Sequence, residues 1–450
     1  MARRTLKICA GSEHTSKIIE LVESILSEPQ DAALRVHSRD LSRDGILSQE
    51  LLVTLLLFMV GDANRRGYHH LVQQFWSQCH RQGIPLPTAD PVSASAFCQA
   101  RVKISIELLL RILSQVSERF EKAFARSTRW HGLRVLAVDG SKFNLQRSDE
   151  LQQAFGRPSG GHCPQATVST LFNVTSRVPL DVRIAPFASC ERKLLIEHLE
   201  QVREGDVLVL DRGYPSFALL SELLKRRIQF LIRVPDSHTF ESFDWFRQHQ
   251  KQDFRLVLHP PAGSARDAAP IELRAVRLKN SKGEASYFVT TLMRTEFSRS
   301  HIAELYHLRW QIEELYKLEK SAYFDARQFH ARTAHGVKQA IVAQALFVAI
   351  ARFLMAAAAH QSGVSDLDLS MKAGILSLAE FLTLLFVAET SAASTSIPHL
   401  LRILARARNR RRPRRSCPRR SFKPGPRWAP DGRRGAYWHW LKGLVFDSLD

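Results

Sequence analysis

The chain has 450 residues, of which 45% are hydrophobic and 24% are charged. These proportions, together with a length that can bury a large core, exclude a collagen-like, low-complexity or fully disordered chain. The formal net charge of +20, from 64 Lys and Arg against 44 Asp and Glu, predicts a polyanionic partner. Nucleic acid is the first candidate and an anionic membrane surface the second.

Cysteine usage and apolar stretches indicate the cellular setting. The six cysteines are scattered without a C-x-x-C pair, which argues against a structural zinc site or a disulfide framework and is typical of a reducing cytosol. The N-terminal segment is basic but has no apolar run, so we expect no signal peptide. Stretch 51–60 is too short to span a membrane, and stretch 340–359 is interrupted by Gln344 and Arg352. Both are predicted to be core helices of a cytoplasmic protein.

Residues 1–130 are predicted to form a helical N-terminal domain. Apolar periodicity predicts helices over 48–60 and 67–80, and one long amphipathic helix opens after the cap-like Ser93 or Ser95. We expect exposed basic side chains of this domain to bind DNA, and the alternative is a helical scaffold that only packs on its neighbour. These side chains are Arg65, Arg66, Arg101 and Lys103.

Residues 131–235 change to short apolar runs that predict five strands and two helices. Their order is β-β-β-α-β-α-β, and three meandering strands followed by crossover helices predict a mixed sheet in which the first and fourth strands are neighbours. The predicted strands cover 133–140, 166–174, 178–187, 205–214 and 228–235, and the helices cover 190–202 and 216–227.

Residues 236–295 alternate polar and apolar side chains and are predicted to form a β-rich insertion. Residues 296–360 would complete the sheet-containing core and include a polar helix. Residues 361–450 are predicted to continue as apolar helices to about residue 405 and to end in a basic tail.

The basic tail differs in composition from the rest of the chain. Between Arg402 and Arg434 there are 14 Lys or Arg and one Asp, so this stretch carries 14 − 1 = 13 of the 20 net positive charges. Interleaved prolines favour a disordered arm. We expect the arm to contact the DNA backbone, and the alternative is a tail that only keeps the protein soluble.

The segment Tyr306–Lys320 contains no Gly or Pro and is predicted to be one helix with two stripes. An apolar stripe recurs every three or four residues and should be buried. The neighbouring polar stripe presents one carboxylate among a phenol and three cations. The ordinary interpretation is a solvated face whose ion pairs are each worth ~0.3–0.5 kcal/mol. The apolar stripe is Leu305, Leu308, Ile312 and Leu315, and the polar stripe is Tyr306, Arg309, Glu313, Lys317 and Lys320.

Three acids are expected to converge on one edge of the sheet. Asp139 ends the first predicted strand and Asp211 the fourth, so they would stand side by side, and a helix packed across that edge would add Glu313. Three carboxylates repel one another, and divalent ions with oxygen ligands, such as Mg²⁺, resolve this repulsion. Two such ions roughly 4 Å apart activate a water or 3′-hydroxyl for phosphodiester displacement.

Each acid also has a structural alternative when it is taken singly. Asp139 could lie in a turn, Asp211 could cap the next helix, and Glu313 could be an ion-pair partner. Asp181 and Glu191 are acids of ordinary sequence context, as is Asp149.

The chain resembles bacterial insertion-sequence DDE transposases of the Y-x2-R-x3-E-x6-K subgroup. It reads Tyr306-x2-Arg309-x3-Glu313-x6-Lys320, a full match, and its segments LAVDG and LVLDRGY match the two aspartate blocks of the family. The resemblance runs from about residue 95 to the basic tail. It implies an α/β fold with a ribonuclease-H-like mixed-sheet core, a β-rich insertion, and flanking helical N- and C-terminal regions.

The resemblance also implies roles for single residues. The catalytic, metal-binding residues would be Asp139, Asp211 and Glu313, holding two Mg²⁺ ions that Mn²⁺ can replace. Contacts to DNA near the cleaved end would come from Tyr306, Arg309, Lys317 and Lys320, because Arg and Lys neutralise phosphates. Members of the family stack a flipped base on a Trp late in the β insertion. This chain has Tyr287 at that place, and a Tyr ring can stack as well.

The sequence is therefore interpreted as a DNA transposase of the bacterial cytoplasm, associated with the nucleoid. It would bind the terminal inverted repeats of its element as a homodimer, cleave the ends and join them to target DNA by cut-and-paste transposition. Two alternatives stay open: a non-catalytic DNA-binding protein derived from a transposase, and a ribonuclease-H-like nuclease without strand transfer.

Overall fold

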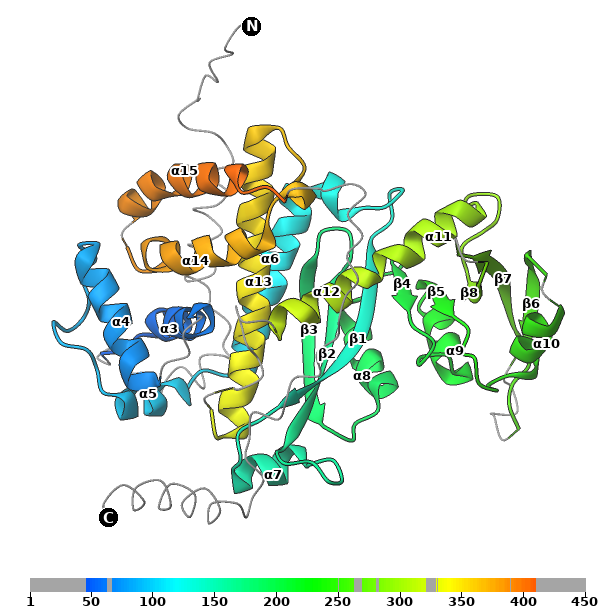
Figure 1. Cartoon of the computed structure of the whole chain (residues 1–450), viewed down its shortest axis with the longest axis horizontal. Coiled ribbons are helices and arrows are strands. Elements are labelled where there is room, and N and C mark those ends of the chain that lie inside the picture. The colour runs from blue at the N-terminus through cyan, green and yellow to red at the C-terminus, as the bar shows by residue number, and fades with distance from the viewer. Residues whose placement is uncertain are drawn as a thin grey trace, which may run out of the picture. The chain divides into compact units, whose positions relative to one another are not determined.

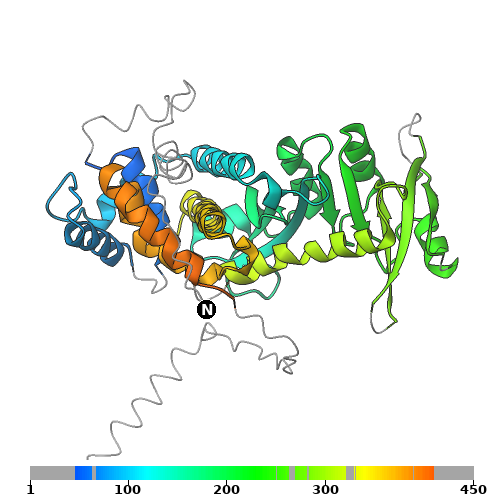
Figure 2. The ribbon, with the colours of Figure 1, turned by 90° about the horizontal axis from the view of Figure 1, so that it is seen from above.

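The computed structural model describes residues 46–409, apart from gaps at 63–66, 250, 263–268, 281–282, 321–328, 330 and 389. The described residues all belong to one compact unit. In the described part, an eight-stranded mixed sheet has helices on both faces (Figures 1 and 2). Arg65, Arg66 and the basic tail beyond residue 409 lie outside the described residues, so their predicted DNA contacts stay predictions.

The sheet has the strand order β3-β2-β1-β4-β5-β8-β7-β6. β1 (Val135–Asn144) pairs antiparallel with β2 (Gln165–Asn173), which pairs antiparallel with β3 (Val178–Pro186). On its other side β1 pairs in parallel with β4 (Val207–Leu210), and β4 in parallel with β5 (Gln229–Arg233). This order and these directions are ribonuclease-H-like, so the predicted fold class is confirmed, including the contact between the first and fourth strands.

The β-rich insertion extends the core sheet. β8 (Ala285–Thr290) pairs antiparallel with β5 and with β7 (Ile271–Lys279), and β7 pairs with β6 (Asp253–Leu258). The insertion also contains α10 (Glu241–His249), which the sequence analysis did not predict. The predicted domain boundaries at residues 131, 236, 296 and 361 stay predictions.

Helices cover both faces of the sheet because successive strand residues point to opposite sides. On β1, Ala137 faces one hydrophobic cluster and Val138 the other. The first cluster includes side chains of two long helices, and the second includes side chains of two shorter ones. The long helices are α6 (Ile106–Ala123) and α13 (Ala334–Ser362), and the shorter ones are α8 (Glu191–His198) and α9 (Phe217–Lys225).

The central helix α13 gathers elements from both ends of the chain. Its 29 residues are long and apolar enough to cross a membrane, but its apolar window is 100% buried by other parts of the protein. It is therefore a core helix. Around it pack α6, α3 (Gln49–Gly61), α14 (Met371–Phe386) and α15 (Thr390–Arg406) (Figure 1).

Two helices predicted as continuous are each divided. The helix after Ser93 is split into α5 (Ala94–Arg101) and α6, because Ser105 caps α6 by accepting a hydrogen bond from the Leu108 N–H at 3.1 Å. The N-terminal helices also include α4 (Tyr68–Arg81).

The segment Tyr306–Lys320 is likewise not one helix. It spans the end of α11 (Arg299–Leu308) and all of α12 (Trp310–Glu319), and the break falls at Arg309. The Arg309 N–H donates to the Tyr306 carbonyl at 3.1 Å, a spacing of three residues where an α-helix has four. A further helix, α7 (Asp149–Phe155), was not predicted.

Candidate active site

Asp139 lies on β1, and Asp211 directly follows the neighbouring strand β4. In the parallel β1–β4 pair Ala137 lies opposite Val209, an offset of 209 − 137 = 72. Extended by two residues, the same offset would bring Asp139 level with Asp211, one residue past the end of β4, and the charge of Asp211 acts on Asp139. β1 continues to Asn144, because β2 still pairs with it beyond β4, so the prediction that this strand ends at Asp139 was wrong.

The polar stripe of α11 and α12 reaches these two aspartates. The Tyr306 hydroxyl donates to Asp211 Oδ1 at 3.2 Å. Lys320, at the end of α12, donates to the Ser141 hydroxyl two residues beyond Asp139. α12 is fixed over β1 by Tyr316, whose hydroxyl donates to the Asp139 carbonyl at 2.7 Å. Helix and strands thus form one cluster.

Arg309 supplies positive charge to this cluster. It is only 9% exposed, and its Nη2 donates to Glu313 Oε1 at 2.5 Å. Its charge also acts on Asp139 and Asp211. Among the described residues, no partner bonds the buried Nε of Arg309. The carboxylate of Glu313 is therefore bound to an arginine in the same cluster as both aspartates.

The electrostatics of the site favour a cation. Burial raises the pKa of Asp139 to about 6, with Glu191 and Asp211 adding to the rise, while the Gly140 N–H at 2.9 Å and Arg309 oppose it. Burial also raises the pKa of Tyr306 to about 12, and Asp211 acts in the same direction. Asp139 therefore lies in poorly solvated surroundings and is repelled by Glu191 and Asp211.

The donor set fits a hard divalent cation. Asp139, Asp211 and Glu313 offer only carboxylate oxygens, the ligands that Mg²⁺ prefers. In the arrangement that the structure describes, no three His, Cys, Asp or Glu side chains within the described ranges converge closely enough to hold a metal ion. To complete the predicted triad, Glu313 would have to leave its ion pair with Arg309 and bind the metal ion instead.

Two of the predicted DNA contacts lie outside this cluster. Lys317 donates to Glu314 at 2.5 Å and its ammonium lies 4.5 Å from the centre of the Trp310 ring, on an exposed part of α12. Tyr287 packs edge-on against Phe246 of α10, with ring centres 5.0 Å apart. The structure therefore places Tyr306, Arg309, Glu313 and Lys320 in the cluster with the two aspartates, but neither Lys317 nor Tyr287.

Glu191 and Tyr214 near the site, and Trp310 farther out on α12, were not proposed as site residues by the sequence analysis. Glu191 opens α8 and lies against Gly140, and Tyr214, three residues after Asp211, is buried. Trp310, 47% exposed, donates from its indole to Glu314 on the outer side of α12. The position of Tyr214 in the LVLDRGY block was a usable signal, whereas Glu191 is brought close only by the packing of α8.

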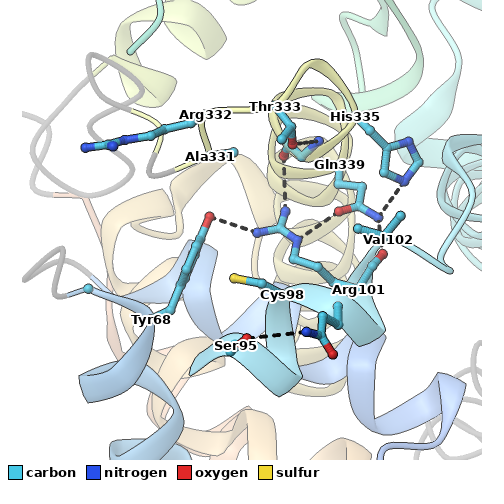
Figure 3. A pocket seen from close by; sticks show the side chains of 13 residues that line it. Tyr68, Ser95, Cys98, Arg101, Val102, Ala331, Arg332, Thr333, His335 and Gln339 are labelled. Carbon is cyan, nitrogen blue, oxygen red and sulfur yellow. Dashed lines mark hydrogen bonds between the residues drawn. The ribbon is translucent and has the colours of Figure 1, made fainter. Parts of the chain in front are cut away.

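A pocket of about 590 Å³ lies elsewhere, between α5 and the N-terminus of α13 (Figure 3). Arg101 crosses it and is only 4% exposed, so the prediction that Arg101 is exposed for DNA was wrong. Its guanidinium donates to Gln339 Oε1 at 2.9 Å, the Tyr68 hydroxyl at 3.0 Å and the Gly336 carbonyl at 3.1 Å. Arg101 thus joins the N-terminal helices to α13, while Lys103 is exposed as predicted.

The fold and this cluster define a class of protein. A ribonuclease-H-like sheet that places two aspartates side by side beneath a helix carrying a glutamate is typical of enzymes that act on phosphodiester bonds with divalent metals. A family model described as a transposase DDE domain matches residues 130–350, which include all three acids. This match and the relatives below make the chain similar to bacterial insertion-sequence transposases with a DDE domain.

Individual relatives share part of the chain. Transposase InsG for insertion sequence element IS4 of Escherichia coli (strain K12) is 25% identical over 309 residues, 66% of this chain. InsZ of the same organism is 26% identical over 140 residues, 29% of this chain. The matches cover 65% of InsG and 46% of InsZ, so they span less than two thirds of either relative.

Among solved structures, piggyBac transposase in a synaptic complex with hairpin DNA matches with a TM-score of 0.44 and 12% identity, covering 90% of this chain and 84% of that one.

Proposed function

We propose that this transposase binds the terminal inverted repeats of its element, cleaves the DNA there and joins the ends to target DNA in a cut-and-paste reaction. The observation that carries the proposal is the proximity of Asp139, on β1, to Asp211, directly after β4, with Tyr306 and Arg309 of the polar stripe acting on them. The class of substrate follows from the family and from the net charge of +20.

The three acids would be the metal ligands. Asp139, Asp211 and Glu313 would hold two Mg²⁺ ions, or Mn²⁺ in their place, which activate the attacking water or 3′-hydroxyl and stabilise the leaving oxygen when bound. Burial leaves the carboxylate of Asp139 poorly hydrated, which strengthens its attraction for a cation.

The cations of α11 and α12 would hold the DNA. A phosphate that takes over Arg309 would release Glu313 from its ion pair at the moment when the substrate is present, because one guanidinium cannot serve both anions fully. Tyr306 and Lys320 lie at the same aspartates and would bind the phosphates beside the cleaved bond. Lys317, about half exposed, would contact a phosphate farther from it, and Tyr287 would have to leave its packing on Phe246 to stack on a base.

Further parts of the proposal concern assembly. We propose a homodimer that holds both ends in a synaptic complex in the bacterial cytoplasm, on the nucleoid. The exposed Lys103 of the N-terminal domain and the basic tail would contact the DNA backbone outside the active site.

The test is a cleavage and strand-transfer assay on DNA that carries the ends flanking the gene. The native protein and Asp211→Asn are compared with Mg²⁺ and with Mn²⁺. We expect metal-dependent nicks at the ends and joined products from the native protein alone, with end binding nearly unchanged in the variant. Equal cleavage by both proteins would refute the roles of the triad. End binding without cleavage in either would favour the non-catalytic DNA-binding protein, and nicks without joined products would indicate a nuclease.

A further inference from the structure

We propose that Glu191, in the first turn of α8, is a fourth carboxylate of the candidate active site and binds a divalent cation of the Mg²⁺ type together with Asp139 and Asp211. This inference rests on the proposed function and extends it, because the sequence and the family motifs point only to Asp139, Asp211 and Glu313.

The first support is a close approach between α8 and β1. A Cβ atom added to Gly140 would lie 2.6 Å from Glu191 Cδ and 2.7 Å from Oε1, distances that no real Cβ contact shows. Gly140 therefore leaves room for the carboxylate of Glu191 directly beside the backbone of Asp139. The charge of Glu191 acts on the carboxyl group of Asp139, because Glu191 and Asp211 both raise its pKa in addition to burial.

The second support is the way α8 is anchored. His198 lies 198 − 191 = 7 residues after Glu191, two helical turns on, so both side chains share the helix face toward the sheet. The His198 ring is fully buried, with Nδ1 2.8 Å from Asp181 Oδ2 and Nε2 3.1 Å from the Ser169 hydroxyl. This bonding to β2 and β3 fixes the rotation of α8 and thereby holds Glu191 at β1.

The third support is a buried hydroxyl with no partner. Tyr214 is 2% exposed, and within the described ranges its hydroxyl forms no hydrogen bond. Besides burial, the charges that raise its pKa are those of Asp139, Glu191 and Asp211. Buried polar groups in folded proteins rarely stay unpaired. A hydrated cation shared by these carboxylates would offer the hydroxyl an oxygen to bond.

The distribution of ion pairs favours Glu191 over Glu313 as the acid that meets a cation first. Glu313 is bound to Arg309 at 2.5 Å. Glu191 forms no ion pair with any described residue, and Asp211 forms none either. Glu191 and Asp211 thus lie near Asp139 without ion pairs of their own among the described residues, and Arg309 is a positive charge that acts on Asp139 and Asp211. In the described arrangement these acids do not converge closely enough to hold a metal ion, so a bound cation would have to draw them together.

The test measures Mn²⁺ binding by the full chain at pH 8, where Asp139 is ionised. The electron paramagnetic resonance signal of free Mn²⁺ reports how much of the ion is bound. We expect Glu191→Gln to weaken binding at least about tenfold. The matched control is Glu197→Gln, an exposed position of the same helix, which should bind as the native protein does. The melting temperature without Mn²⁺ should not fall in Glu191→Gln, because the variant removes a repulsive charge.

A second variant tests the geometry independently. In Gly140→Ala the new methyl group occupies the space of the Glu191 carboxylate, so Mn²⁺ binding should fall to the level of Glu191→Gln. In a Glu191→Ala background the same Gly140→Ala change should have little further effect, because the group that it displaces is gone. A full additional loss there would contradict the proposed contact.

The outcomes separate the two proposals. If Asp139→Asn and Asp211→Asn lose Mn²⁺ but Glu191→Gln binds as the native protein does, Glu191 is not a ligand and the proposed function stands. If the native protein binds no Mn²⁺, or none of these variants alters its binding, the metal site fails as a whole and both proposals fall. Loss of end cleavage with Mg²⁺ in Glu191→Gln, alongside weaker Mn²⁺ binding, would support both.

Discussion

The strands β1 and β4 carry a pair of charged side chains at each end, and the same strand register relates the residues of both pairs. Arg134 precedes β1 and Asp206 precedes β4, and their offset of 206 − 134 = 72 is also the offset between Asp139 and Asp211. At the first end the paired side chains carry opposite charges, whereas at the second they carry like charges. A parallel register therefore brings side chains together without regard to charge, and the residues chosen decide whether the contact stabilises the fold or attracts a ligand.

The first end is a satisfied ion-pair cluster. Arg134 Nε donates to Asp206 Oδ1 at 2.8 Å, and its second nitrogen bonds the other carboxylate oxygen. Glu121 of α6 accepts from Arg134 at 2.9 Å, and the Arg203 N–H donates to Asp206 at 2.7 Å. Burial opposes the charge of Arg134, but the bonds to Asp206 and Glu121 outweigh it and raise the pKa of the guanidinium. The cluster ties α6, β1 and β4 together.

The largest effect is expected from a substitution at the Asp139–Asp211 end of the strand pair. Asp139→Asn keeps the shape of the side chain but removes a metal ligand, so end cleavage should fall at least about a thousandfold, or ~4 kcal/mol of transition-state stabilisation. Since burial raises the folded pKa of Asp139 to about 6 from 3.8, ionised Asp139 destabilises the fold above that range.

The same variant should therefore be more stable to urea at pH 8 than the native protein, by about 1–3 kcal/mol, and this gain should vanish as the pH falls below about 4. Lower stability at pH 8 would contradict the view that this end carries unfavourable charge.

The same type of substitution at the Arg134–Asp206 end should have the opposite effect on stability. Asp206→Asn leaves the buried guanidinium of Arg134 without its bidentate partner, and urea unfolding should show a loss of about 3–5 kcal/mol. The control is Glu204→Gln, which removes a pair with Arg227 whose side chains are 67% and 78% exposed, and which should change stability by less than about 0.5 kcal/mol. Equal effects of the two variants would mean that burial at this end contributes nothing.

A smaller effect concerns Glu319, a buried acid at the end of α12. It is 6% exposed, and burial raises its pKa to about 8 from 4.5, although Lys320 opposes the shift. The folded state thus keeps the proton that the unfolded state loses, and stability from this group falls as the pH rises from about 4.5 to 8. Glu319→Gln should raise the melting temperature at pH 8–9, by the equivalent of about 1–4 kcal/mol, and hardly at pH 4. A gain independent of pH would refute the titration of Glu319.

Local sequence patterns were sufficient for the strands and for the principal candidates. The apolar run before Asp139, the block around Asp211 and the helical spacing of Leu305, Ile312 and Leu315 each reflect a short-range preference, and those leucines and the isoleucine are buried. The helix boundaries were harder to predict from the local sequence. Ser105 resembled any polar residue of an amphipathic helix until its hydroxyl was seen to cap α6, and nothing local marks the break at Arg309.

The sequence alone predicted the five core strands, the neighbouring first and fourth strands with their acidic residues, and the polar stripe, because these follow from periodicity, residue types and the order of the elements. Only the tertiary structure decided that Arg101 is buried against α13, that Arg309 binds Glu313, and that Glu191 lies beside Asp139. These contacts join residues whose meeting depends on how helices rotate and pack against a sheet. That choice is set by the whole core, so no single stretch of sequence contains it.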